Sequence, residues 1–300
     1  MNALDRIQAR VDARMAEIEA RAGLAASSSP SVSGTVSASQ RFDVSGVLRA
    51  FGQDGSVRGG CRKVGLCVGV KDVDPSAYGG CPQPCPGCDL DATDFASILD
   101  AAGVGTTLLV DSRATRRGVV QAMRTAASAL RDGDLFVMSV AGHGARETLD
   151  GKEGTSVHES WCLWDGKLFD YEIVSAVREF APGVRIVMVN DQCHSGGIFS
   201  ECARDVFPGG VLRGLTRGGG AAPMLIQFAA CRAEESSIGY PIGGTWMTAL
   251  MKVLAIDRHI SWKEWFDRAR EHPSLTERQR PQWFEVGPVS DDFRRGEVFK

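Results

Sequence analysis

Five short apolar runs alternate with stretches of helical periodicity along residues 61–300. The runs are rich in Val, Leu and Ile and lie at 64–70, 106–110, 135–140, 185–190 and 225–230. Apolar runs of this length without polar alternation predict strands that are buried on both faces. Apolar residues repeating every three to four positions predict helices at about 91–102, 115–131, 170–180, 245–255 and 261–271. Strands that alternate with helices indicate an α/β fold, in which helices cover both faces of a mostly parallel sheet.

The first 60 residues fall outside this alternation. One helical face of the N-terminus would carry Leu4, Ile7, Val11, Met15 and Ile18. Residues 1–26 are therefore predicted to hold an amphipathic helix, which would pack on the rest of the protein or bind a partner. Residues 27–60 begin with a Ser-rich stretch and are predicted to be a flexible linker and lead-in to the main domain at 61–300.

The composition bounds the class of protein. A chain of 300 residues, 43% of them hydrophobic, can bury one sizeable core. A net charge of −3 gives no general attraction to nucleic acid or to anionic membranes, so neither is expected as a partner. No apolar stretch has the length of a membrane span, and the polar start MNALDRIQARVDARM differs from a signal peptide. Nine cysteines, an odd number, fit free thiols, so we expect a cytoplasmic protein.

Two of the predicted strands run into glycine-flanked polar loops that carry a histidine and a cysteine. VMSVAGHGAR contains His143, and IVMVNDQCHSGG contains Cys193. Because the carboxyl ends of neighbouring parallel strands open onto a common crevice, the two residues can meet there. An imidazole beside a thiol can take its proton and later return it to a leaving amine. The pattern predicts Cys193 as nucleophile, His143 as its base, and the backbone N–H groups of Gly144 and Cys193 as oxyanion donors.

These segments resemble the caspase-like cysteine peptidases, and among them the metacaspases and orthocaspases. Animal caspases carry a QAC-type signature about 50 residues after the histidine, whereas this chain has DQCHSG at 191–196. The resemblance covers roughly residues 62–286, in which KVGLCVGV, GCDLDATDFASIL, GDLFVMSVAGHG, ESWCLWDGKLFDYEI, DQCHSGG and LIQFAACRAEES follow the family's order.

The resemblance implies the caspase-like (caspase-hemoglobinase) fold, a three-layer α/β/α sandwich. It also implies that the domain divides into a large-subunit-like part at 61–200, a loop at 201–223 and a small-subunit-like part at 224–300. The implied activity is that of an endopeptidase whose partners are protein or peptide substrates.

Acidic residues near the nucleophile indicate the preferred substrate. Asp191 precedes Cys193 by two positions, and the resemblance places Asp91, Cys88 and Ala141 in the same pocket. Two carboxylates in one small pocket favour a cation, so cleavage after Arg, with Lys accepted less well, is expected. Asp91 has an alternative role, because an acid near the start of the 91–102 helix would stabilise that helix N-terminus.

The loop at 201–223 offers sites for self-processing. It contains Arg204, Arg213 and Arg217 in a glycine-rich context. An enzyme that cuts after Arg could cut itself in such a loop, and Arg217, which precedes three glycines, is the first choice. An ordinary surface loop that stays uncut is the alternative.

No cofactor or metal is expected. The calcium-dependent relatives have acids where this chain has Tyr171 and Ser200, and a cation that wants six or more oxygen ligands binds weakly without them. The acids that keep a calcium site open as an alternative are Asp150, Glu153 and Glu159.

Two rival interpretations remain. Cys81, Cys85 and Cys88 form CxxxCxxC, a spacing that suits an iron–sulfur cluster or, together with Cys61, a structural zinc site. The other rival is a catalytically silent or partner-activated caspase-like protein that binds peptides without cutting them. Its support is Ala141, which replaces the Ser that family members often have two residues before the histidine.

Overall fold

The computed structural model describes residues 9–14, 16–17, 60–80, 82–151, 154–199, 222–272, 275 and 279–300. A six-stranded sheet lies at the centre of these residues, in the order β11-β8-β7-β3-β1-β2. Its strands are β1 (Lys63–Gly69), β2 (Gly105–Val110), β3 (Leu135–Ala141), β7 (Arg185–Asp191), β8 (Met224–Ala229) and β11 (Gln282–Val286). All neighbouring pairs are parallel except β11 and β8, which are antiparallel. The five predicted strands are therefore confirmed.

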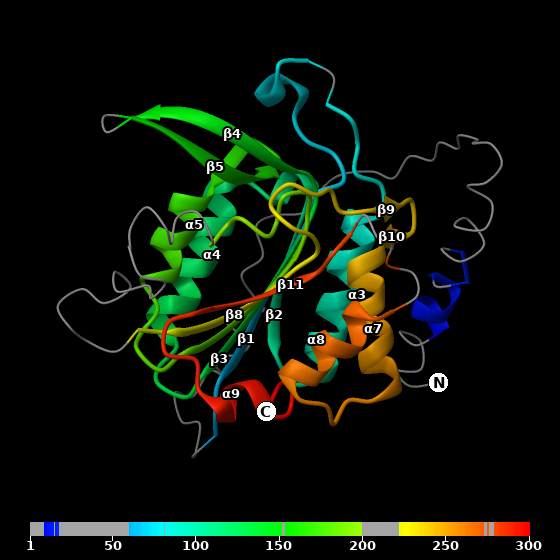
Figure 1. Cartoon of the computed structure of the whole chain (residues 1–300), viewed down its shortest axis with the longest axis vertical. Helices are drawn as coiled ribbons and strands as arrows, with labels where there is room; N and C mark the ends of the chain where they lie inside the picture. The colour runs from blue at the N-terminus through cyan, green and yellow to red at the C-terminus, as the bar shows by residue number, and fades with distance from the viewer. Residues whose placement is uncertain are drawn as a thin grey trace.

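Helices cover both faces of this sheet, which confirms the predicted three-layer caspase-like sandwich. Figure 1 shows α4 (Arg116–Ala129) and α5 (Asp170–Val177) on one face, and α3 (Cys88–Ala101), α7 (Thr245–Ile256) and α8 (Trp262–Arg270) on the other. The helix α3 begins three residues earlier than predicted, because Gly87 takes the left-handed conformation as its N-cap. A last short helix, α9 (Asp291–Arg295), lies near the C-terminus.

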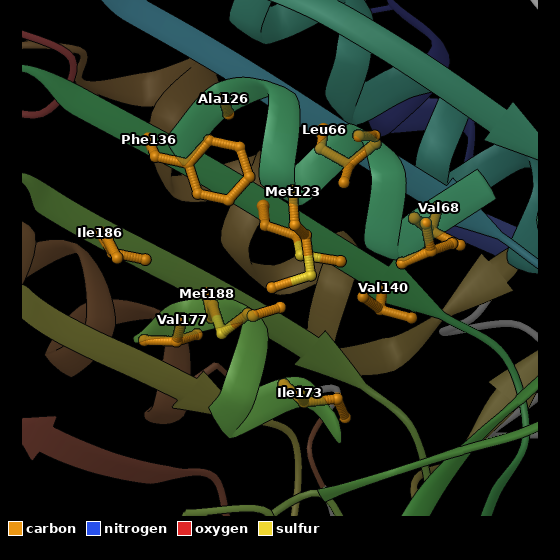
Figure 2. Close-up of a cluster of buried hydrophobic side chains, with 14 of the residues drawn as sticks. Leu66, Val68, Met123, Ala126, Phe136, Val140, Ile173, Val177, Ile186 and Met188 are labelled. Atoms are coloured by element: carbon orange, nitrogen blue, oxygen red, sulfur yellow. The ribbon is translucent and has the colours of Figure 1, made fainter. Parts of the chain in front are cut away.

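Each face of the sheet has its own apolar layer. Figure 2 shows the layer under α4 and α5, where Met123, Phe136 and Met188 meet in the space between helix and sheet. The opposite layer is aromatic, and Trp265, which is 0% exposed, stacks on Phe95 and donates its indole N–H to a backbone carbonyl of α7. Burying large side chains on both sides holds the strands rigid, and with them the loops at the carboxyl ends of the strands.

Smaller antiparallel elements flank the central sheet. A three-stranded sheet contains β4 (Gly144–Gly151), β5 (Gly154–Leu163) and β6 (Gly166–Phe169), and a short pair contains β9 (Gly239–Tyr240) and β10 (Gly243–Gly244). Two short 3-10 helices, η1 (Pro75–Tyr78) and η2 (Asp111–Arg113), lie in loops. None of these elements, nor β11, was predicted from the apolar pattern.

The N-terminal helix is described in part, since residues 9–14 and 16–17 are helical. Val11 is fully buried in the aromatic layer, so this segment packs on the domain. Residues 27–59 of the predicted linker and lead-in lie outside the described residues, and so do Arg204, Arg213 and Arg217. Among the helices of the described residues, none is both long and apolar enough to cross a membrane.

Candidate active site

The register of two central strands places the histidine and cysteine loops side by side. β3 and β7 are parallel neighbours in which Ala141 is aligned with Asp191. His143 and Cys193 each follow two residues beyond this aligned pair. A Cβ added to Gly144 would lie under 3.0 Å from the carbonyl oxygen of Cys193 and 3.1 Å from its carbonyl carbon. The two loops are thus in direct backbone contact, and only glycine fits at position 144.

A backbone carbonyl orients the imidazole of His143. The ring Nε2 lies 2.9 Å from the carbonyl oxygen of Gln83. A carbonyl oxygen can only accept, so Nε2 carries the proton of this hydrogen bond. In the neutral ring, Nδ1 is then left with its lone pair and can accept a proton. Gln83 lies in the segment that leads into α3, which is far from His143 in sequence.

The thiol of Cys193 lies on a tight turn after β7. Cys193 is free and half-buried, and its thiol donates a long hydrogen bond, 3.9 Å, to the carbonyl oxygen of Ser237. The next residue, His194, has a φ of 61° and places Nδ1 2.7 Å from the carbonyl oxygen of Ala233. The ring of His194 therefore contacts the loop after β8, and His143 is the histidine whose loop contacts Cys193.

Two buried carboxyl groups converge on one glycine beside this turn. Asp91, in the first turn of α3, is 0% exposed, and Asp191, at the end of β7, is 5% exposed. The N–H of Gly244 donates to Asp91 Oδ2 at 2.7 Å, and a Cβ on Gly244 would lie under 3.0 Å from Asp191 Oδ2. Asp191 also accepts the hydroxyl of Ser237 and, at 3.0 Å, the N–H of Met247. The structure therefore brings together the two acids that sequence reasoning paired.

Burial dominates the electrostatics of these acids. The pKa of Asp91 is raised from its ordinary value to about 8, mainly by loss of solvent and also by the nearby Asp191, while Arg14 and the Gly244 N–H oppose the rise. Burial likewise raises the pKa of Asp191, against the hydrogen bonds from Ser237 and Met247. Two carboxyl groups with raised pKa in one site favour a ligand that brings a positive charge.

The cysteines before α3 depart from the expectation of free thiols. Cys88, the first residue of α3, is disulfide-bonded to Cys85, and their Cα atoms are 6.0 Å apart, within the usual span of a disulfide. Cys85 and Cys88 are therefore not available as thiolate ligands. This excludes the iron–sulfur cluster and the zinc site that would have used both of them. Cys81 lies outside the described residues, and within the described residues no group of three or more His, Cys, Asp or Glu side chains could hold a metal.

Ala141 is buried at the end of β3. It is 1% exposed, and its carbonyl oxygen accepts the N–H of Val70 at 2.9 Å. Sequence reasoning missed Gln83 and Gly244, which act through their backbone, because a main-chain contact leaves no side-chain signal. It also missed Ser237, which touches both Asp191 and Cys193 from the loop after β8.

Comparison with known proteins agrees with this geometry. Residues 90–201 match the family model described as metacaspase, peptidase C14 domain. The protein GSU0716 from Geobacter sulfurreducens has a similar structure, with a TM-score of 0.66 and 26% identity over 79% of this chain and 98% of that chain. Caspase-1 from Spodoptera frugiperda shares the fold, with a TM-score of 0.50 and 12% identity over 75% and 86% of the two chains. No curated protein matches the chain significantly.

The sheet order, the two helical layers and the paired loops define a caspase-like α/β protein. Within that class, the chain is similar over residues 90–201 to the metacaspase peptidase C14 domain.

Proposed function

We propose that this protein is a cysteine endopeptidase that cuts after Arg, and less readily after Lys, with Cys193 and His143 as its catalytic dyad. The observation that carries the proposal is the register of β3 and β7, which sends the histidine and cysteine loops out of the sheet from the same level. The hydrogen bond from His143 Nε2 to the Gln83 carbonyl supports it, because it leaves Nδ1 to act as the base.

The reaction proceeds in two halves. The sulfur of Cys193 attacks the substrate carbonyl carbon as the thiol proton passes to His143 Nδ1, and a C–S bond forms. His143 then gives this proton to the leaving amine as the C–N bond breaks, which leaves a thioester. Water attacks the thioester with His143 as base, and collapse of that intermediate releases the acid and restores the thiol.

Backbone donors would stabilise the charge that develops on the carbonyl oxygen. We assign this role to the N–H groups of Gly144 and Cys193, whose backbones are in contact. Donors fixed by strand ends need no reorganisation when the charge appears, and one such donor contributes about 10²–10³-fold in rate in well-studied cases.

The acids at Gly244 would select a basic side chain. Asp91 and Asp191 reach this glycine from different elements, α3 and β7. A planar guanidinium can hydrogen-bond two carboxylates at once, whereas an ammonium binds as a point charge, so Arg is preferred over Lys. Cys88 at the start of α3 and Ala141 at the end of β3 complete the proposed pocket wall.

We further propose that turnover does not require calcium. Asp170, which precedes Tyr171 in the segment compared with the calcium-dependent relatives, is 0% exposed and already has partners for both oxygens. Its Oδ1 lies 2.8 Å from His158 Nδ1, and its Oδ2 accepts the N–H of Glu159 at 3.2 Å. Asp150 is exposed and accepts the hydroxyl of Thr155. Self-processing after Arg204, Arg213 or Arg217 remains part of the proposal.

Fluorogenic peptides ending in Arg, Lys or Asp test the activity. We expect Arg-selective turnover, unchanged by calcium or a chelator, that falls at least about 10³-fold in Cys193→Ala and in His143→Gln. Cys61→Ala is the matched control, because Cys61 is also a free cysteine but is exposed and distant in sequence from the site. Mass spectrometry of the chain itself would identify fragments that end at Arg217.

Turnover that survives Cys193→Ala, or that prefers Asp, would overturn the proposal. So would the absence of Arg-directed turnover from every variant that retains both catalytic residues.

A further inference from the structure

The N-terminal segment, residues 9–14 and 16–17, places a buried arginine against the acids of the proposed pocket. Arg14 is 6% exposed, and its Nη2 lies 2.8 Å from Asp91 Oδ1. Its Nη1 lies 3.4 Å from Asp94 Oδ2, and its Nε donates to the carbonyl oxygen of Ile242. All three guanidinium nitrogens are thus directed at α3 and at the turn before β10.

Arg14 uses the oxygen of Asp91 that a substrate would need. Asp91 Oδ2 accepts the Gly244 N–H, and Oδ1 is paired with Arg14. A Cβ added to Gly243 would lie under 3.0 Å from both Arg14 Nη2 and Asp91 Oδ1, so the pair is packed against the Gly243 backbone. A second guanidinium therefore cannot pair with Asp91 while Arg14 remains in place.

Few contacts of the described residues attach the segment to the domain. Val11 is fully buried in the layer that contains Trp246, and it is the described apolar anchor of the segment. Asp12 pairs with Lys252, and Arg10, whose side chain is 52% exposed, pairs with Asp94 at 2.9 Å. Exposed ion pairs add little to such docking. A contact of this kind can open without unfolding the sheet.

We infer that Arg14 is an internal ligand of the basic-residue pocket, so that the docked N-terminal segment must leave before an arginine of a substrate can bind. The inference rests on the proposed function, because it concerns the same acids. Binding of substrate is then reduced by the fraction of molecules in which the segment is docked. The role of the amphipathic N-terminal helix would then be to occupy the pocket with Arg14 until substrate binds.

Three variants of the full chain test this inference with Arg-ending peptides. Arg14→Met removes the guanidinium and keeps an unbranched apolar side chain, and Val11→Ala keeps Arg14 but weakens docking. Arg10→Met is the matched control, because Arg10 lies one helical turn earlier and pairs with Asp94 rather than Asp91. We expect the first two variants to lower KM for Arg peptides on the order of tenfold, and Arg10→Met to change it less than about twofold.

The outcomes separate the two proposals. If Arg14→Met raises KM or leaves it at the wild-type value, Arg14 is a structural counter-ion of Asp91 and the inference is wrong. If Arg14→Met does not fold, as judged by circular dichroism, Val11→Ala decides, because it retains the ion pair. If neither wild type nor any of the three variants turns over Arg peptides, the proposed function itself fails.

Discussion

Gly144→Ala probes the contact between the two loops that carry His143 and Cys193. The added Cβ would lie under 3.0 Å from the carbonyl oxygen of Cys193, 3.1 Å from its carbonyl carbon and 3.4 Å from the Cβ of Gln192. The carbon–carbon distance that van der Waals packing favours is about 3.5–4.0 Å. Both loops end strands of the buried sheet, so neither can withdraw freely, and the clash with the carbonyl oxygen requires them to part by about 1 Å or more.

The size of the effect follows from this displacement. Overpacking of a buried contact costs about 1–3 kcal/mol of unfolding free energy. A misplacement of about 1 Å in reacting groups can cost about 10²-fold in rate. Gly144→Ala should therefore lower kcat/KM for Arg peptides about a hundredfold, with a Tm only a few degrees below that of the wild type.

Gly103→Ala is a control that distinguishes a loss of stability from a displacement of the two loops. Gly103 has a φ of 75° and no atom within 4 Å of an added Cβ, so Gly103→Ala should cost about 1–2 kcal/mol through its left-handed backbone alone. Turnover of the two variants is compared below the lower Tm. If Gly144→Ala keeps more than half of the wild-type rate, or if Gly103→Ala loses as much, the argument from loop contact is refuted.

Three further predictions concern the acids and the core. Burial raises the pKa of Asp91 from 3.8 to about 8. Between these values the native protein keeps a proton that the unfolded chain has lost, so the free energy of unfolding falls as pH rises. Asp91→Asn should make that slope shallower in urea titrations, with the remainder coming from Asp191, whose pKa is also raised; parallel profiles would contradict this. Ser237→Ala should raise KM for Arg peptides about fivefold with kcat nearly constant, by removing a hydrogen bond to Asp191; normal KM would count against it. Trp265→Ala should cost about 3–5 kcal/mol in urea unfolding, against less than about 0.5 for Ile256→Ala, which is 72% exposed; equal losses would refute the packing argument.

The central strands could be predicted because they are buried on both faces. LFVMSVA of β3 is buried at every position, so its sequence is a continuous apolar run. The hairpin of β4 and β5 was missed because GARETLDG of β4 is mostly polar and its side chains are largely half-buried or exposed. β11 was missed because it is an edge strand that pairs only with β8. It is mostly half-buried or exposed, so it contains polar residues such as Gln282 and Glu285 rather than a continuous apolar run.

Site residues could be predicted only where a local sequence pattern indicated their position. His143 and Cys193 stand at the ends of apolar runs, which places them at one edge of a parallel sheet. The pairing of Arg14 with Asp91 spans 77 residues, and no local period connects the two. Likewise, an odd number of cysteines does not exclude the bridge from Cys85 to Cys88.

The pairing of β7 with β8 determines what a break in the peptide chain between them would do. The two strands flank residues 200–221 in sequence, and they pair in parallel from Arg185 with Met224 to Asn190 with Ala229. A single nick between them would leave these backbone hydrogen bonds and both apolar layers in place. The fragments would then separate on a denaturing gel but elute together in gel filtration. The sheet, rather than the peptide chain, would keep β7 joined to residues 224–300.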